Sequence, residues 1–146
     1  SVWYRVEEVY YDSRREGQQK TDAEYADMLE RLAAGREIQR VIVDPSAASF
    51  IEALRREGFR VVRADNDVAD GIRVTADLLK RRRIVICDAC ADCLWEMETY
   101  CWDDKGRRDA PKKEQDHAMD DLRYFAMDLA AEEQNGFAAT WVERRA

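Results

Sequence analysis

The sequence has little that would place it in a membrane or outside the cell. No run approaches the ~18 consecutive apolar residues of a membrane span. The N-terminal residues also lack the basic and then apolar pattern of a secretory signal. We therefore expect a soluble, cytoplasmic protein that does not enter a membrane. Its four cysteines are then expected to be thiols rather than disulfides.

Two further absences narrow the function. The phosphate-loop motif G-x-x-x-x-G-K-[ST] does not occur, which excludes ATP hydrolysis by such a loop in these residues. Basic residues are the minority, with 24 Lys and Arg against 31 Asp and Glu and a net charge of −7. An acidic domain holds nucleic acid only through local basic clusters, and each cluster here is more simply a solvated helix face or turn. The clusters are Arg14–Arg15, Arg55–Arg56, Arg81–Arg83, and Arg107–Arg108 with Lys112–Lys113.

At 146 residues the chain is most simply one domain, spanning residues 1–146. Segments rich in β-branched and aromatic residues alternate with segments of helical periodicity. This alternation predicts an α/β fold with a mainly parallel sheet. The expected strands are 2–11, 38–43, 59–64 and 84–86; the expected helices are about 21–35, 45–58, 70–83, 89–99 and 116–134, with a hairpin at 100–110.

Local signals support three of these helices. Thr21 and Glu24 form a capping-box pattern at the start of the first one. In the helix at 89–99 the periodicity predicts that Leu94 and Trp95 are buried. Asn135-Gly136 is expected to end the last helix, because these residues adopt the left-handed conformation easily.

Asp44 ends the apolar strand expected at 38–43 and directly precedes Pro45. Proline suits the first turn of a helix, and Asp44 or Ser46 is expected to cap that helix. Asp44 also has a functional interpretation. The carboxyl ends of parallel strands line the crevice where α/β proteins bind their ligands, so Asp44 would project into that crevice.

The final helix opens with Asp116 and with His117, the only histidine of the chain. Acidic residues are favoured in a first helical turn by the helix dipole, whatever their function. However, His117 and Asp120 are three residues apart and share one helix face. A carboxylate able to hold Mg²⁺ beside an imidazole able to relay a proton is a nuclease-like pairing. Asp121 lies on the adjacent face, where it is expected to pair with Arg123 or with solvent.

The cysteine spacing C-x2-C-x2-C over Cys87, Cys90 and Cys93, with Cys101 further on, suggests a zinc or iron–sulfur site. Paired C-x2-C knuckles are absent, however. Cys87 ends a buried strand, and Cys90 and Cys93 lie in a helix whose apolar face needs small side chains. We therefore expect the cysteines to carry no metal.

Four motifs follow one another along the chain. They are Val-Ile-Val-Asp44-Pro-Ser-Ala-Ala-Ser-Phe, Asp67-Val-Ala-Asp-Gly71-Ile72, Glu96-Met-Glu-Thr-Tyr100-Cys-Trp102-Asp103 and Asp116-His-Ala-Met-Asp120-Asp-Leu-Arg-Tyr124. In this order they resemble the C-terminal nuclease domain of tailed-phage terminase large subunits. The resemblance covers nearly the whole chain.

This resemblance implies an RNase H-like fold, with a mixed sheet flanked by helices, and a metal-dependent endonuclease that cuts concatemeric viral DNA during genome packaging. It implies that Asp44 and Asp120 are catalytic and ligate Mg²⁺ or Mn²⁺ in a two-metal site, and that His117 orients water or shuttles a proton. Double-stranded DNA, the terminase small subunit and the portal protein are the implied partners, in the cytoplasm of a bacterial host cell. We predict that Asp44 and Asp120 converge and that His117 is at least partly exposed to solvent.

The family's first catalytic aspartate lies upstream of all these motifs. We therefore expect the chain to lack the first strand or strands of the domain, as well as the ATPase domain. Two-metal hydrolysis needs carboxylates around ions about 4 Å apart, so nuclease activity is expected to be weak or absent. We also expect the 2–11 strand, or a second chain, to pair along the edge of 38–43. Another RNase H-like nuclease, such as a junction resolvase, and a non-catalytic docking module for packaging partners remain alternatives.

Overall fold

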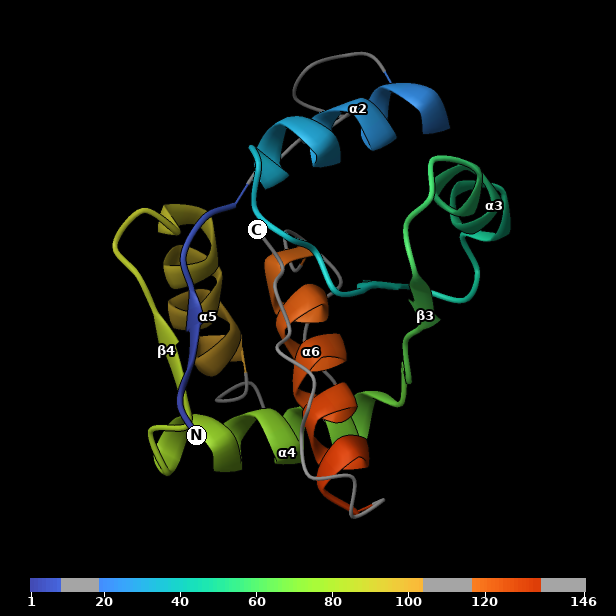
Figure 1. Ribbon diagram of the computed structural model, residues 1–146. Coiled ribbons are helices and arrows are strands. Elements are labelled where there is room, and N and C mark those ends of the chain that lie inside the picture. The colour runs from blue at the N-terminus through green and yellow to red at the C-terminus, as the bar shows by residue number, and fades with distance from the viewer. Residues whose placement is uncertain (9–18, 104–116, 135–146) are drawn as a thin grey trace.

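The computed structural model describes residues 1–8, 19–103 and 117–134. Within them, short strands alternate with helices, which confirms the predicted α/β class (Figure 1). The elements are β1 (Trp3–Arg5), α2 (Asp22–Ala33), β2 (Val41–Val43), α3 (Ala48–Arg56), β3 (Val61–Arg63), α4 (Val68–Lys80), β4 (Ile84–Ile86), α5 (Ala91–Asp103) and α6 (His117–Gln134). No helix among these residues is long and apolar enough to span a membrane.

The described strands form two parallel pairs. β2 pairs with β3, and β1 pairs with β4 with Tyr4 opposite Val85. Because β1 lies beside β4, the expectation that the 2–11 strand would pair along 38–43 is wrong; a second chain at that edge stays a prediction. Trp3 accounts for the place of β1, since its ring packs edge-on against Phe125 of α6 with centroids 5.7 Å apart.

The predicted cap of α2 is confirmed, and the predicted cap of α3 is wrong. Thr21 accepts a hydrogen bond from the backbone N–H of Glu24, as the capping-box pattern requires. α3 begins only at Ala48, and its N-cap residue, Ala47, has no side-chain hydrogen bond. Asp44 is turned to other partners, described below, and Ser46 donates its hydroxyl hydrogen to Asp44.

α5 differs from the prediction in which side chains it buries and in where its C-terminal end lies. Trp95 is 50% exposed and Leu94 is also exposed, so their predicted burial is wrong. Within 91–98, the part of this helix whose burial is described, the buried side chains are Cys93 and Glu96, which lie on the opposite face. The helix continues to Asp103, so no hairpin begins at residue 100. The rest of the expected hairpin and the Asn135-Gly136 cap lie outside the described residues.

α6 runs between the two strand pairs and connects the two halves of the core (Figure 1). It packs on α4 and α5 through a cluster that includes Leu78, Met119 and Leu122. On its other side it meets β2, where Arg40 is only 2% exposed and pairs with Asp128 and Glu132 of α6. Through these contacts the end of β2 lies beside the first turns of α6.

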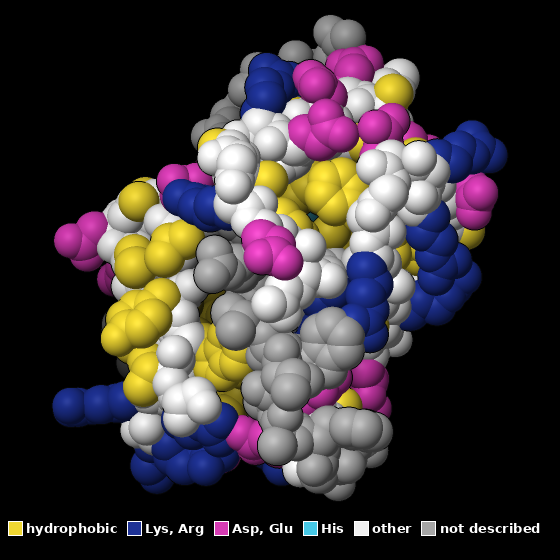
Figure 2. Space-filling view, in the orientation of Figure 1, with side chains coloured by type: hydrophobic (Ala, Val, Ile, Leu, Met, Phe, Trp, Pro, Cys, Tyr) yellow, Lys and Arg dark blue, Asp and Glu magenta, His cyan; other side chains and the backbone are white. Residues whose placement is uncertain are grey.

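Figure 2 shows hydrophobic side chains gathered on the face over β1 and β4. The exposed large hydrophobic side chains include Tyr4 and Val85, which are opposite each other in the strand pair. Charged side chains of both signs lie around this face.

Candidate functional site

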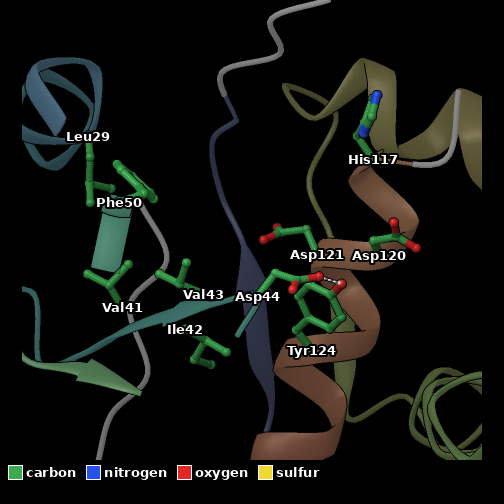
Figure 3. A pocket seen from close by; sticks show the side chains of 10 residues that line it. All are labelled: Leu29, Val41, Ile42, Val43, Asp44, Phe50, His117, Asp120, Asp121 and Tyr124. Atoms are coloured by element: carbon green, nitrogen blue, oxygen red, sulfur yellow. Dashed lines mark hydrogen bonds between the residues drawn. The ribbon is translucent and has the colours of Figure 1, made fainter. Parts of the chain in front are cut away.

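A pocket of about 380 Å³ lies where β2 ends against the N-terminal half of α6 (Figure 3). Its polar wall consists of Asp44, His117, Asp120, Asp121 and Tyr124, and its apolar wall is built from α2, β2 and α3. Asp44 and Asp120 both line this pocket, although 76 positions separate them (120 − 44), and that their carboxylates share ions stays a prediction. The apolar lining residues are Leu29, Val41, Ile42, Val43 and Phe50.

Asp44 is held by three hydrogen bonds. Its Oδ1 accepts from the backbone N–H of Ser46 at 2.8 Å and from the Ser46 hydroxyl at 2.7 Å, which closes a local turn. Its Oδ2 accepts from the hydroxyl of Tyr124 at 2.6 Å. The Tyr124 bond, followed by the Ser46 bonds, lowers the pKa of Asp44 below its ordinary value. The carboxylate is therefore charged and fixed in orientation at neutral pH.

Tyr124 is the link between the strand end and the helix. It lies one helical turn after Asp120, and its pKa is raised, mainly by burial and then by the hydrogen bond to Asp44. The phenol therefore keeps its proton and acts only as a donor to Asp44. This bond joins β2 and α6 across 80 positions of sequence.

Asp120 has its own partner, Arg123, which lies three residues further on α6 and donates to Asp120 Oδ1. Arg123 is 5% exposed, and its guanidinium carbon lies 5.7 Å from the centroid of the Tyr124 ring. Gly71 of α4 leaves room for it, because a Cβ on Gly71 would lie 3.2 Å from both Cδ and Nη1 of Arg123. The Asp120 carboxylate is thus oriented by an arginine that is itself packed in place.

Asp121 is a third carboxylate of the pocket, which the sequence did not single out as functional. The expected partners, Arg123 or solvent, did not include Arg5 of β1, which donates to Oδ2 of Asp121 at 2.5 Å, and the Asp121 side chain is also 25% exposed. Arg5 also donates to Glu8, whose Oε1 accepts from the backbone N–H of Asp92 at the start of α5. The separation of 116 positions between Arg5 and Asp121 explains why no local pattern predicted the pair.

His117 is the first residue of α6, lines the pocket and is exposed, which confirms the prediction that it is accessible to solvent. Figure 3 shows it at the start of the helix, with its ring directed away from Asp44. Water can therefore reach the imidazole in the pocket that holds the two aspartates. A proton carrier needs such contact with water.

The donor atoms of this pocket suit a hard divalent cation. Carboxylate oxygens are the ligands that Mg²⁺ and Mn²⁺ prefer. Within residues 1–8, 19–103 and 117–134, no three His, Cys, Asp or Glu side chains are grouped so that they alone could hold a metal ion. Magnesium commonly binds through one or two carboxylates, with water and substrate phosphate as further ligands. Asp44 and Asp120 fit this second kind of site.

Cys87, Cys90 and Cys93 are not among the residues that line the pocket. Cys90 and Cys93 are fully buried in the cluster between α5 and α6, which agrees with their expected role as small core side chains. Burial raises the pKa of Cys93 to about 11, so the thiol keeps its proton at neutral pH. Cys87 is half-buried, and the side chain of Cys101 lies outside the described residues.

No protein-family model matches the sequence. The large terminase subunit of Escherichia phage T5 is 25% identical over 128 residues, which are 83% of this chain and 29% of that protein. The large terminase of a thermophilic bacteriophage, solved in complex with ADP, is 44% identical with a TM-score of 0.82. The match covers 88% of this chain and 34% of that terminase. In another crystal form of the same thermophilic phage terminase the identity is 41% and the TM-score 0.80.

An identity of 44% over 88% of the chain, together with a TM-score of 0.82, exceeds what a shared fold class alone would give. The chain spans about a third of the length of the proteins that it matches. It is therefore a homologue, over most of its own length, of phage terminase large subunits.

Proposed function

We propose that this chain is the C-terminal nuclease domain of a terminase large subunit, a divalent-metal-dependent endonuclease that cuts concatemeric viral DNA during packaging. The observation that carries the proposal is the shared pocket of Asp44 and Asp120. Two carboxylates, one at a strand end and one on a distant helix, and an exposed imidazole line this one pocket. Homology to large terminase subunits supports the assignment to DNA packaging, and the two carboxylates support the proposed metal-dependent cleavage.

Asp44 and Asp120 would hold Mg²⁺ or Mn²⁺. When bound, such ions activate water and stabilise the oxygen that leaves the phosphodiester. The chain's own residues prepare the site for them. Tyr124 and Ser46 keep Asp44 charged and oriented, and Arg123 orients Asp120. His117, which is exposed, would orient a water molecule or carry a proton away from it.

Arg63 is the residue we propose for contact with a DNA phosphate beside this site. It ends β3, opposite Val43, and its guanidinium lies 3.5 Å from the carbonyl oxygen of Pro45, directly after Asp44. The side chain is exposed. An arginine there would offset the negative charge of Asp44 and Asp120 as the DNA backbone approaches.

The proposal is tested by plasmid nicking with Mn²⁺. We expect weak nicking that requires Mn²⁺ and is lost in both D44N and D120N. D77N is the matched control, because Asp77 is an exposed aspartate of α4 whose partner is Arg81. Equal nicking by D44N, D120N and the unchanged chain would contradict the proposed site.

A comparison of DNA substrates addresses the specific reaction. A terminase nuclease is expected to cut linear and supercoiled duplexes, whereas faster cutting of four-way junctions would indicate a junction resolvase.

The terminase small subunit and the portal protein are proposed partners on grounds of homology alone. The cytoplasm of a bacterial host cell is proposed as the place of action on the same grounds. Metal-independent binding to either protein, without any nicking, would instead indicate a docking module.

A further inference from the structure

Glu96 is a buried carboxylate that the proposed chemistry does not use. It lies in the middle of α5 and is 1% exposed, although a buried acidic side chain is costly unless its charge is compensated. It does not line the pocket, so it is no candidate ligand for the ions.

Its partners lie at the start of α6. Glu96 Oε1 accepts hydrogen bonds from the backbone N–H of Ala118 at 2.9 Å and of Met119 at 3.1 Å. The first N–H groups of any helix lack partners within the helix, and a carboxylate near this end is also favoured by the helix dipole. Glu96 therefore caps α6 from another helix, 22 positions upstream of Ala118.

The capped turn is the one that carries the site. His117 precedes the two capped amides, and Asp120 follows them directly. The other half of α6 is held separately, because Arg40 pairs with Asp128 and Glu132, and Arg83 pairs with Glu133. Among these anchors, Glu96 is the one that acts on the backbone of the first turn.

We propose that Glu96 is a positioning residue: by bonding the amides of Ala118 and Met119, it fixes the first turn of α6 and thereby holds His117 and Asp120 in the pocket that Asp44 also lines. This inference rests on the proposed function for its consequence in catalysis. The claim that Glu96 fixes the first turn of α6 does not depend on any metal or DNA.

The test compares E96A with E96Q and uses three measurements. An amide side chain keeps an oxygen that can accept the two hydrogen bonds, whereas alanine removes it. We expect E96A to speed hydrogen exchange of the Ala118 and Met119 amides by about tenfold, the size of a typical lost cap. E96A should also shift the ring resonances of His117, which are unambiguous because it is the only histidine. E96Q should restore most of both signals.

In the nicking assay, E96A is expected to lower kcat for DNA while leaving KM close to its original value, because DNA contacts are unchanged and only the site geometry loosens. E98A, an exposed glutamate of the same helix, is the matched control and should change none of these readings. Unchanged exchange at Leu78 of α4 shows that E96A is folded. If E96A does not fold, E96D, which keeps the charge on a shorter side chain, takes its place with the same expected result.

The inference is overturned if E96A leaves the Ala118 and Met119 exchange rates and the His117 resonances unchanged, or if E96Q is as defective as E96A. Its failure is distinguishable from failure of the proposed function. Normal Mn²⁺-dependent nicking by E96A would contradict the positioning role of Glu96 and still support the proposed nuclease function. If E96A changes the amide exchange and the His117 resonances but the unchanged chain never nicks DNA, the role of Glu96 in fixing the turn is supported and the proposed nuclease function is contradicted.

Discussion

Replacing Gly71 by alanine should damage the site through Arg123 rather than through α4 itself. Gly71 lies within α4, where alanine ordinarily stabilises a helix by about 0.5–1 kcal/mol. Here the new Cβ at position 71 would lie 3.2 Å from Cδ and from Nη1 of Arg123, and 3.3 Å from the Cβ of Arg123. These contacts are closer than the roughly 3.5–4.0 Å at which carbon atoms pack best. The far end of Arg123 can move away, but its Cβ moves only with the backbone of α6.

The expected magnitude follows from these two opposing terms. Overpacking a filled site costs about 1–3 kcal/mol, which exceeds the gain from helix propensity. We therefore expect G71A to lower the free energy of unfolding by about 0.5–2 kcal/mol. Moving Arg123 also releases Asp120, so Mn²⁺ affinity should fall even under conditions where the protein remains folded.

Urea unfolding of four proteins provides the assay: the unchanged chain, G71A, R123A and the double variant. With Arg123 shortened to alanine, the contacts to Cδ and Nη1 are lost and only the contact to its Cβ remains, so G71A should cost about 1 kcal/mol less than in the unchanged chain. The coupling between the two substitutions is then about 1 kcal/mol. If G71A has the same effect on stability with and without Arg123, then the close approach of these residues does not explain the glycine.

Three further outcomes follow from the geometry of the site and the core. Y124F should raise the pKa of Asp44 towards its ordinary value. It should lower the free energy of unfolding by about 1–2 kcal/mol at pH 7, and this loss should shrink as the pH falls below about 4. The direction follows from the lowered folded pKa, which contributes stability only while the carboxylate is charged; equal losses at pH 7 and pH 3 would refute it. R63Q should weaken DNA binding measured with Ca²⁺ and reduce its salt dependence by about one phosphate contact, while leaving Mn²⁺ affinity unchanged. Cys93 should react with a thiol reagent at pH 8 only after unfolding, because burial holds its pKa at about 11; rapid reaction in the folded protein would contradict its place in the core.

Features determined by neighbouring residues were predictable from the sequence. The cap of α2 depends on residues three positions apart, and β4 was expected at the residues where it forms. The strand that ends at Asp44 and the helix that begins at His117 were also expected, because apolar runs and helical periodicity are local patterns. Local patterns therefore predict two of the pocket's three carboxylates, Asp44 and Asp120.

Features that depend on distant partners were not predictable in this way. Asp121 belongs to the pocket because Arg5 holds it, and no pattern links residues so far apart. Asp44 does not cap α3, because Tyr124 and Ser46 take its oxygen atoms instead. Trp95 was expected to be buried from periodicity alone, but Glu96 occupies the inner face since it caps another helix. In each case a tertiary hydrogen bond overrides the local pattern.

The central claim is that Asp44 and Asp120 form a divalent-cation site. Crystals of the chain grown with Mn²⁺ and measured for anomalous scattering test it most directly. The account predicts an anomalous peak in this pocket, with carboxylate oxygens of Asp44 and Asp120 among its ligands at about 2 Å, and no such peak in crystals of D44N. A peak only elsewhere in the molecule, or the same pocket peak in D44N, would contradict the claim.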